Sequence, residues 1–438
     1  MSSHGESLSA QRAGSPVSPP GRPKGESLSA QRAGSSMSSL LRLNTELAQP
    51  SPLFFGYDIA AQFSNTLDEM LDGEPADKLF LVADKGVYSA HAFGRALCEA
   101  RRDVELVLVD PGESSKSWDG LEALCEYMVA HRASKRSVAI AFGGGSIGNL
   151  VGMAAALLFR GIRYVEAPTS FMHLTDGVLS NKQAINGRSG KNHFGIYHAP
   201  LFIWADVRHL ETEPARSMKA GIAEAVKNAL ISSTALATSL RARLRSDCRY
   251  AAAELRELAL SAILAKLEIL RRDPSEKRYA LVLEYGHTFA HAIEWLAQGT
   301  LLHGECVAVG MKMAAHLANE LGLIADSVVD LHYELIDGCL DLAPELPPSI
   351  DAAALLAAMK RDNKRTGANL RFVLLDGLGS CANPEGDWLV TVADDAYLAD
   401  FATRFLGTYP WRLQKRVRTP AQATAARTTV RLPQPALA

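Results

Sequence analysis

The sequence has little cysteine, no long hydrophobic run and almost no net charge. Its six cysteines are scattered through 438 residues and include no CxxC pair. This pattern indicates reduced thiols in a cytoplasmic protein and gives no disulfide framework. No run of about 18 apolar residues predicts a transmembrane helix, and no apolar signal-peptide core follows Met1.

The balance of charge also excludes some partners. Lysine and arginine total 46 against 48 acidic residues, for a net charge of -2. We therefore expect no general attraction to nucleic acid or to an anionic membrane. Apolar residues make up 47% of the chain, which is enough for a globular core.

Both ends of the chain have the composition of disordered tails, over residues 1–50 and 411–438. Small and polar residues dominate both tails and cannot bury enough apolar surface to offset the entropy of ordering. A transit peptide is an alternative for the N-terminal tail, but Glu6 and Glu26 argue against it. The motif GESLSAQRAGS occurs twice in that tail, at Gly5–Ser15 and Gly25–Ser35.

Residues 51–205 predict an α/β domain. Short β-like runs alternate there with helical stretches, a pattern typical of a parallel sheet covered by helices on both faces. The runs are KLFLVAD, VELVLVD, SVAIAFGG and YVEAP.

Residues 206–410 predict an all-α second domain. Four long helical segments lie between about residues 211 and 323, and Pro347 and Pro348 interrupt the pattern. More helix and one short strand pair near RFVLLDGLG follow. The cleft between the two domains is the expected site.

A glycine-rich turn in SVAIAFGGGSIGN connects a predicted strand to a helix. Glycines allow a pyrophosphate to approach the backbone, and the helix N-terminus favours an anion. A plain tight turn is the alternative, since the loop is not a standard GxGxxG. Asp84 and Asp110 each end a β-like run, where an acidic side chain can bind a ribose or simply terminate the strand. Glu113 and Lys116 share the next turn.

Histidines and one glutamate on predicted helices form a candidate metal centre. His287 and His291 lie four residues apart on one helix face, His303 begins the next helix, and Glu224 lies on an apolar helix. Three His and Glu ligands with an open position are typical of catalytic zinc. Structural histidines remain the alternative, because the sequence alone does not show that these residues converge.

Several lysines lie in segments of low charge. They are Lys182, Lys191, Lys227 and Lys266. Any one of them alone is best explained as a solvated surface charge. As a set around a metal, they indicate an anionic substrate such as a phosphate ester.

In this order, the residues of 53–410 resemble the 3-dehydroquinate synthase-like, or sugar phosphate cyclase, superfamily. The resemblance implies an NAD-binding α/β domain, a helical domain that binds Zn or Co, and a homodimer. It also implies one active site for oxidation, phosphate elimination, reduction, ring opening and aldol closure.

The resemblance assigns roles to residues of this chain. It implies NAD contacts at Asp84, Glu113, Lys116, Gly144, Gly145, Asn149, Thr169, Ser170, Lys191, Asn192 and Thr212. Metal ligands match Glu224, His287 and His303. Catalytic positions match Asp176, Lys182, Lys227, Lys266, Glu284 and His291. Substrate contacts match Arg160 (reaching the neighbouring subunit's substrate), Asp176, Lys182, Lys266, Glu284 and Lys364.

Departures from the family pattern indicate a subfamily. In the RxxxNxGHT motif of 3-dehydroquinate synthases, this chain has Ala280 and Glu284 in place of Arg and Asn, so the bidentate carboxylate partner is absent. These two residues, the KQAIN stretch and Asn149 resemble the 2-deoxy-scyllo-inosose synthases. Glucose 6-phosphate is the substrate that this resemblance implies. The segments SNKQ and MHLTDG are not the commonest family versions.

Other functions remain possible at this point. A 3-dehydroquinate synthase or a sedoheptulose 7-phosphate cyclase would keep the same superfamily. A metal-dependent polyol dehydrogenase would accumulate NADH, whereas a cyclase would not. A non-catalytic binding protein would be expected to have lost part of the metal and lysine set, and every position is filled.

Overall fold

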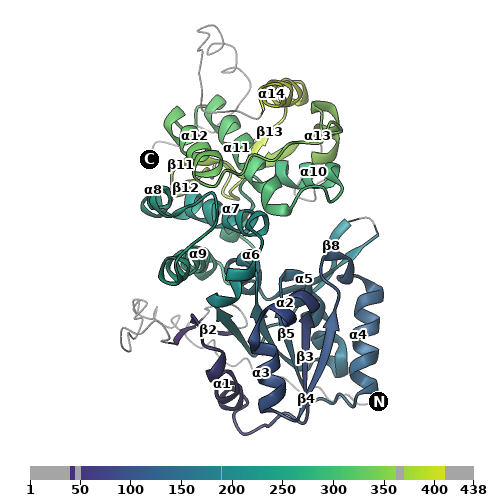
Figure 1. The fold of residues 1–438 in the computed structure, drawn as a ribbon. Coiled ribbons are helices and arrows are strands. Elements are labelled where there is room, and N and C mark those ends of the chain that lie inside the picture. Colours follow the sequence, from purple (N-terminus) through teal and green to yellow (C-terminus); the bar gives the residue numbers. More distant parts are fainter. Residues whose placement is uncertain (1–39, 45–50, 189, 362–368, 410–438) are drawn as a thin grey trace, which may run out of the picture.

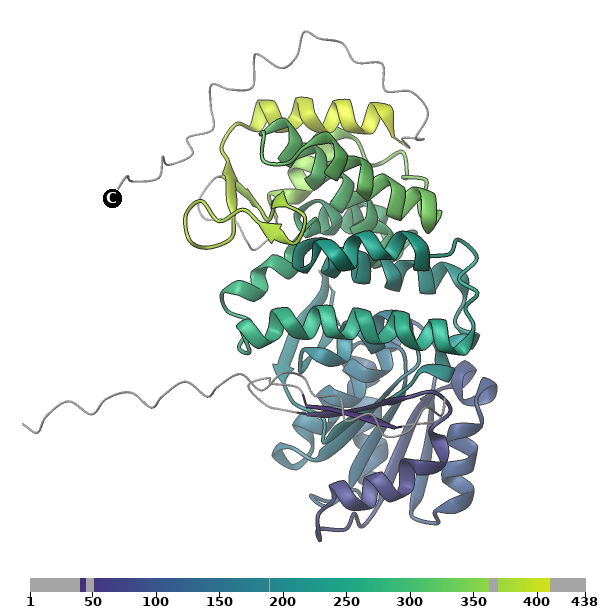
Figure 2. The same ribbon diagram turned by 90° about the vertical axis from the view of Figure 1, so that its left-hand side faces the viewer.

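The computed structural model describes residues 40–44, 51–188, 190–361 and 369–409. Most of the two predicted tails lies outside these residues, as does Lys364. The described chain forms an α/β part in the lower half of Figure 1 and a mainly helical part above it. Figure 2 shows the same two parts one above the other after a quarter turn. The predicted order of an α/β part followed by a helical part is confirmed.

The α/β part is built on a seven-stranded sheet of order β1-β2-β9-β6-β5-β3-β4. All neighbouring strands are parallel except β1, which pairs antiparallel with β2 at the edge. The strands are β1 (Leu41–Asn44), β2 (Pro52–Gly56), β3 (Leu79–Asp84), β4 (Val104–Val109), β5 (Val138–Gly143), β6 (Arg163–Pro168) and β9 (Phe202–Asp206).

Helices cover both faces of this sheet, as the alternating pattern predicts. Phe63 of α1 and Phe93 of α3 pack on one face, and Met128 of α4 and Leu150 of α5 pack on the other. Short helices follow several strands. The helices are α1 (Phe63–Met70), α2 (Lys85–Ala90), α3 (Ala92–Ala100), α4 (Trp118–Ala130), α5 (Gly145–Leu157) and α6 (Phe171–Thr175).

The sheet extends beyond the four quoted runs, which are β3, β4, β5 and β6, because it also contains β1, β2 and β9. The prediction of disorder for residues 1–50 is wrong at Leu41–Asn44, where β1 pairs with β2 and Leu43 is buried. Its apolar residues are too few to stand out in a polar segment, and the pairing with β2 orders them.

The second part of the chain packs helices around one large core. That core also includes residues of β2 and β9, such as Phe55 and Ile203, so the two parts share a continuous interior. The helices are α7 (Ala215–Ser232), α8 (Thr234–Arg243), α9 (Ala252–Arg272), α10 (His287–Ala297), α11 (His303–Glu320), α12 (Asp326–Tyr333), a π-helical turn (Glu334–Cys339), α13 (Ala352–Met359) and α14 (Asp395–Thr408).

The expectation of an all-α second part is wrong in one respect. Four short strands form two antiparallel pairs, β10 with β13 and β11 with β12. The predicted strand segment RFVLLDGLG supplies one strand to each pair. The strands are β10 (Leu370–Phe372), β11 (Leu375–Gly377), β12 (Ser380–Cys381) and β13 (Val390–Val392).

Glycines bring α7, α10 and α11 unusually close together. A Cβ on Gly304 would lie less than 3.0 Å from the carbonyl oxygen of Ala220 on α7. A Cβ on Gly310 would also lie less than 3.0 Å from the carbonyl oxygen of Gly286, just before α10. Gly286 has a φ of 76°, which favours glycine. These contacts hold the starts of α10 and α11 beside the middle of α7.

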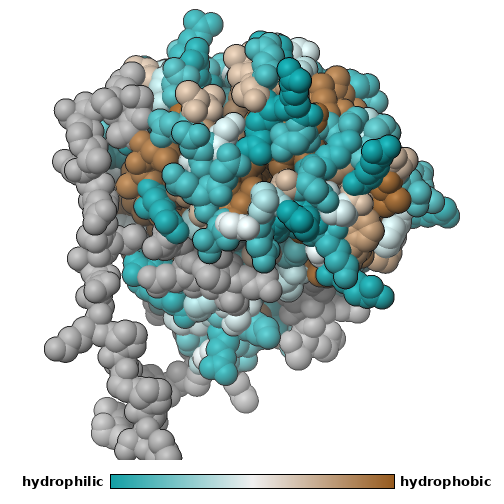
Figure 3. Space-filling view, turned by 90° about the horizontal axis from the view of Figure 1, so that it is seen from below, coloured by the Kyte–Doolittle hydropathy of each residue, from teal (hydrophilic) through white to brown (hydrophobic). Residues whose placement is uncertain are grey.

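The outer surface of the described residues is that of an ordinary globular protein. Seen from below, the surface is mainly hydrophilic, with hydrophobic residues in separate patches (Figure 3). No helix of the described residues is long and apolar enough to cross a membrane.

Candidate active site and metal centre

The residues predicted to contact NAD lie along one edge of the sheet. Asp84, Glu113, Gly144 and Thr169 each end or follow a strand, at the carboxyl ends of β3, β4, β5 and β6. The six-residue 3-10 helix that follows β9 ends at Thr212. Because these strands are parallel, their carboxyl ends share one edge, where open α/β sheets bind ligands.

The glycine turn after β5 presents a helix N-terminus to that edge. Gly144 is the N-cap of α5, which begins at Gly145, and no side chain caps it. A Cβ on Gly143 would lie 2.7 Å from Ile147. The first N–H groups of α5 are therefore exposed to an incoming ligand, as a dinucleotide pyrophosphate requires.

Polar side chains beside this turn are already held in place. Glu113 accepts hydrogen bonds from Ser146 and Asn186, both at 2.8 Å. Lys116 is 6% exposed, and burial lowers its pKa although Glu113 opposes this. Its Nζ donates to the side-chain oxygen of Asn192 at 2.5 Å. The predicted NAD residues Glu113, Lys116 and Asn192 thus form one connected group.

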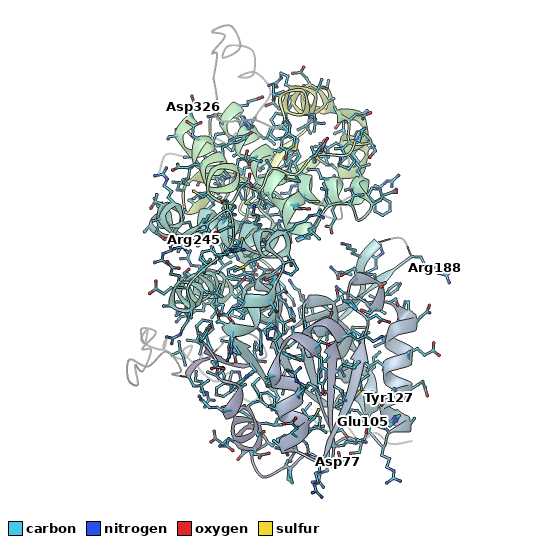
Figure 4. All side chains as sticks on the ribbon, viewed as in Figure 1. Asp77, Glu105, Tyr127, Arg188, Arg245 and Asp326 are labelled. Carbon is cyan, nitrogen blue, oxygen red and sulfur yellow. The ribbon has the colours of Figure 1, made fainter. Side chains whose placement is uncertain are left out.

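Asn149 connects the glycine turn to a β-hairpin. Its amide donates to the Gly145 carbonyl at 2.9 Å, and its oxygen accepts the Ala184 N–H at 2.8 Å. Ala184 lies on β7 (Lys182–Gly187), which pairs with β8 (Gly190–Tyr197). Arg188 marks the tip of this hairpin, which stands out from the sheet on the side of α10 (Figure 4).

A cavity of about 400 Å³ opens between α5 and the hairpin. Its lining includes Lys116, Asn149, Gly177, Lys182, Asn192 and Tyr197. Four residues of the predicted NAD and substrate sets therefore share one cavity.

Glu224, His287 and His303 converge as the sequence predicted. One ligand atom from each lies within 4.8 Å of the other two. Glu224 Oε1 is 3.2 Å from His303 Nε2 and 3.5 Å from His287 Nε2. The two histidines are the first residues of α11 and α10, and Glu224 is in the middle of α7, so the close helix packing creates the site.

The other ring nitrogen of each histidine, Nδ1, also has a hydrogen-bond partner. His287 Nδ1 is 3.1 Å from the carbonyl oxygen of Tyr285, and His303 Nδ1 is 3.0 Å from Glu294 Oε2. Such partners orient metal-binding imidazoles and leave Nε2 for the ion. A carboxylate and two oriented imidazoles suit Zn²⁺ or Co²⁺.

Glu294 was not among the predicted site residues. It lies on the same face of α10 as His287, seven residues on, and this spacing is a signal that could have found it. Its other oxygen accepts from Lys191 Nζ at 2.7 Å. Lys191, predicted as an NAD contact, therefore ties the hairpin to the metal centre.

Buried charges surround the metal triad. Glu224 Oε2 lies 2.5 Å from Lys227 Nζ, and both side chains are at least 96% buried. Burial opposes ionisation, but Lys227 and the two histidines hold the pKa of Glu224 well below its ordinary value. Burial also opposes ionisation of His303 and so lowers its pKa, but Glu224 and Glu294 outweigh burial and raise the pKa to about 10.

Asp176 and Lys266 form a second ion pair beside the first. Lys266 Nζ is 2.8 Å from Asp176 Oδ1 and 2.9 Å from the Asp176 carbonyl oxygen. Burial raises the pKa of Asp176, but Lys266 and Lys227 outweigh it, so the net pKa is lowered. The influence of Glu224 on the same carboxyl shows that the two pairs are neighbours.

The other predicted catalytic residues lie around this cluster. The His291 ring is 5.2 Å from that of His287, on the exposed side of α10. Lys182 forms an ion pair with Glu276. Glu284 is close enough to raise the pKa values of Lys182 and Lys227.

Arg160 lies away from this site. It follows α5, and that helix runs from the carboxyl edge of the sheet back to the amino edge over 13 residues, or about 20 Å. Glu105, near the start of β4, marks this lower edge in Figure 4. Arg160 therefore cannot reach the site of its own chain.

Comparisons with known proteins agree with this geometry. Profiles of the 3-dehydroquinate synthase N-terminal and C-terminal families match residues 106–220 and 221–365. A 2-deoxy-scyllo-inosose synthase of Streptomyces ribosidificus is 38% identical over 316 residues, which are 71% of this chain and 80% of that protein. One of Niallia circulans is 34% identical over 75% of this chain and 90% of that protein.

The chain belongs to the 3-dehydroquinate synthase-like family of sugar phosphate cyclases. A solved 2-deoxy-scyllo-inosose synthase, complexed with carbaglucose-6-phosphate, NAD+ and Co2+, matches with a TM-score of 0.75 and 31% identity. The match covers 84% of this chain and 99% of that one. A 2-epi-5-epi-valiolone synthase from Streptomyces hygroscopicus, with NAD+ and Zn2+ bound, has the same fold with a TM-score of 0.69 and 23% identity.

Proposed function

We propose that this cyclase converts glucose 6-phosphate to 2-deoxy-scyllo-inosose and phosphate. The observation that carries the proposal is the Glu224–His287–His303 triad beside the buried Glu224–Lys227 pair and the Asp176–Lys266 pair, opposite a dinucleotide-type glycine turn. The relatives named 2-deoxy-scyllo-inosose synthase support the choice of product.

The proposed cofactors are NAD and a divalent cation, Zn or Co. When bound, NAD supplies a reversible hydride acceptor and the cation supplies a Lewis acid. The exposed N–H groups at Gly144 and Gly145 would bind the NAD pyrophosphate. Asp84, at the end of β3, accepts the N–H groups of Gly86 and Val87, so its second oxygen is left for a ribose hydroxyl.

The substrate side of the site would be formed by lysines and Glu284. Lys182 lines the cavity of about 400 Å³ and would be available to a phosphate once its ion pair with Glu276 opens. The Lys182 side chain is 50% exposed, whereas that of Glu276 is 9% exposed. Lys227 and Lys266 are too buried to meet bulk solvent, so they act on groups that enter the site. His291, near the triad and exposed, is placed to carry a proton between site and solvent.

The residue at position 280 favours a sugar over a carboxylic acid. Ala280 is 5% exposed and packs in the helical core, so no guanidinium occupies this place. Glu284 would repel a substrate carboxylate and can accept hydrogen bonds from hydroxyls. This argues against 3-dehydroquinate synthesis by this chain.

We further propose a homodimer in which Arg160 contacts the substrate phosphate bound by the partner. Two large apolar side chains beside Arg160 are exposed, Leu157 at 51% and Phe159 at 37%. Burial of such groups would favour association.

The proposed boundary between the NAD-binding and helical domains is near residue 205.

A panel of sugar phosphates tests the proposed substrate. Purified protein with NAD and Co²⁺ would be incubated with glucose 6-phosphate, 3-deoxy-arabino-heptulosonate 7-phosphate or sedoheptulose 7-phosphate, and released phosphate measured. We expect release with glucose 6-phosphate alone. Release with either seven-carbon substrate instead would keep the family and contradict the interpretation of Ala280 and Glu284.

A further inference from the structure

A buried histidine–glutamate pair lies beneath the glycine turn of α5. His173 on α6 contacts Glu166 on β6, with Nε2 and Oε2 3.1 Å apart. The two side chains are 4% and 2% exposed. Neither residue belongs to the predicted NAD, metal or substrate sets, and His173 lies in the uncommon segment MHLTDG.

Glycines on two sides leave room for the imidazole. A Cβ on Gly148 of α5 would lie less than 3.0 Å from His173 Nε2, and one on Gly177 would lie 2.5 Å from Nδ1. At Gly145, the first residue of α5, a Cβ would be 3.7 Å from Nδ1. His173 therefore fills the seam between the glycine turn and the segment that leads to Lys182.

Packing alone does not account for such a polar pair. His173 Nδ1 and Glu166 Oε1 are buried and have no hydrogen-bond partner among the residues that the structure describes. Buried polar atoms without partners cost free energy, and an apolar side chain would fill the same space without that cost. The contact between His173 and Glu166 links α6 to β6.

Helix α6 touches the elements that carry both cofactor sites. On one side, His173 packs against α5 and its glycine turn. On the other side, α6 packs against Gly221 of α7, which lies three residues before the metal ligand Glu224. A Cβ on Gly221 would lie 2.6 Å from the backbone nitrogen of Met172. Asp176, directly after α6, is paired with Lys266.

We propose that His173, held by Glu166, is a positioning residue that fixes the spacing between the nucleotide turn and the metal helix α7. Its effect on turnover rests on the proposed cyclase function. A shift of α6 moves Asp176 relative to both cofactor sites, and misplacement by about 1 Å can lower a rate about 100-fold.

The test compares His173→Ala with a matched core variant, Met128→Ala. Met128 on α4 is fully buried in a core that does not touch the metal helix, so its truncation lowers the melting temperature without moving α6. We expect His173→Ala to raise the Kd for NAD, to alter the visible spectrum of bound Co²⁺ and to lower kcat about 10- to 100-fold. Met128→Ala should change none of these by more than about twofold.

Equal NAD affinity, Co²⁺ spectrum and kcat in the two variants would overturn the proposal and leave His173 a packing residue. If His173→Ala does not fold, His173→Gln and His173→Leu replace it, since they fill the space with and without a donor to Glu166. Gln close to wild type and Leu impaired supports positioning, whereas equal values contradict it. NAD binding and the Co²⁺ spectrum need no glucose 6-phosphate turnover, so a failure of the proposed function remains distinguishable.

Discussion

Paired burial of opposite charges dominates the site at the scale of single residues. Glu224 and Lys227 are withdrawn from water together, and Lys266 is buried against a partly exposed Asp176. Removal of one member leaves a charge buried without its partner, which is far more costly than the pair itself is stabilising. The histidine Nε2 atoms and one glutamate oxygen face each other within this charged environment, where a divalent cation completes the balance.

Glu224→Gln should remove metal binding while preserving the shape of the side chain. The amide cannot supply the negative charge, so we expect Co²⁺ affinity to fall at least about 100-fold and turnover to disappear. Titration calorimetry and the phosphate assay measure the two effects. Glu268→Gln, on the solvent side of α9, is the control and should retain both. An active, metal-free Glu224→Gln protein would refute the metal assignment.

Glu213 should make the stability of the protein depend on pH. Burial raises the pKa of this carboxyl from 4.5 to about 7, although Ser217 and the Phe171 N–H donate to it. The folded pKa exceeds the unfolded one, so the contribution of Glu213 is present below about pH 4.5 and is lost as pH rises through about 7. Glu213→Gln should flatten this decline and raise the melting temperature at pH 8 by about 2 °C or more. An unchanged slope of melting temperature against pH would show that Glu213 ionises freely.

At the scale of elements, the site is built from the starts of helices, the ends of strands and the middle of α7, which carries Glu224 and Lys227. The glycine turn begins α5, and the two histidine ligands begin α10 and α11. Helix α6 and the β7–β8 hairpin connect these sites. The side-chain amide of Asn149 joins that hairpin to the glycine turn through hydrogen bonds to two backbone groups, the Gly145 carbonyl and the Ala184 N–H.

Asn149→Asp should loosen the hairpin. A carboxylate can still accept from the Ala184 N–H, but it cannot donate to the Gly145 carbonyl and would repel it. We expect a loss of about 1–3 kcal/mol in the free energy of unfolding and weaker NAD binding. Hydrogen exchange at the Ala184 amide reports on the hairpin directly. Protection equal to that of wild type would mean that Asn149 does not anchor it.

Local patterns predicted the elements that have strong periodicity or chemistry. The runs at β3, β4, β5 and β6, the long helices and the metal triad are where the sequence places them. The strands β1, β12 and β13 are too short to carry a signal and are fixed by tertiary pairing. Glu294 could have been found from its spacing to His287 on α10, whereas the pair His173–Glu166 depends on the distance between two segments, which spacing along one segment does not reveal.

At the scale of the whole molecule, the shared core makes the two parts one unit, while Arg160 and the exposed Leu157 and Phe159 lie at the far end of α5 from the glycine turn. The first feature explains how a nucleotide turn and a metal triad keep a fixed separation. The second explains why a complete site would need another copy of the chain. The homodimer follows from this arrangement as a proposal with a direct test.

Two inactive variants should complement each other if Arg160 acts on the partner's site. Arg160→Ala and Glu224→Gln, each nearly inactive alone, would be coexpressed with different tags. Random pairing makes about half of the dimers mixed, and each mixed dimer has one complete site, so about a quarter of wild-type activity should return. Activity no higher than that of the separate variants would contradict a contribution of Arg160 across the interface.

The central claim is that NAD is regenerated within one active site, and a single assay measures it most directly. Protein loaded with Co²⁺ would receive glucose 6-phosphate in excess over NAD, while released phosphate and NADH absorbance are followed together. We predict phosphate in large excess over the NAD supplied, a carbocyclic ketone as product, and no accumulation of NADH. Phosphate release that stops at the amount of NAD, or NADH that rises in step with product, would contradict the account and identify a dehydrogenase.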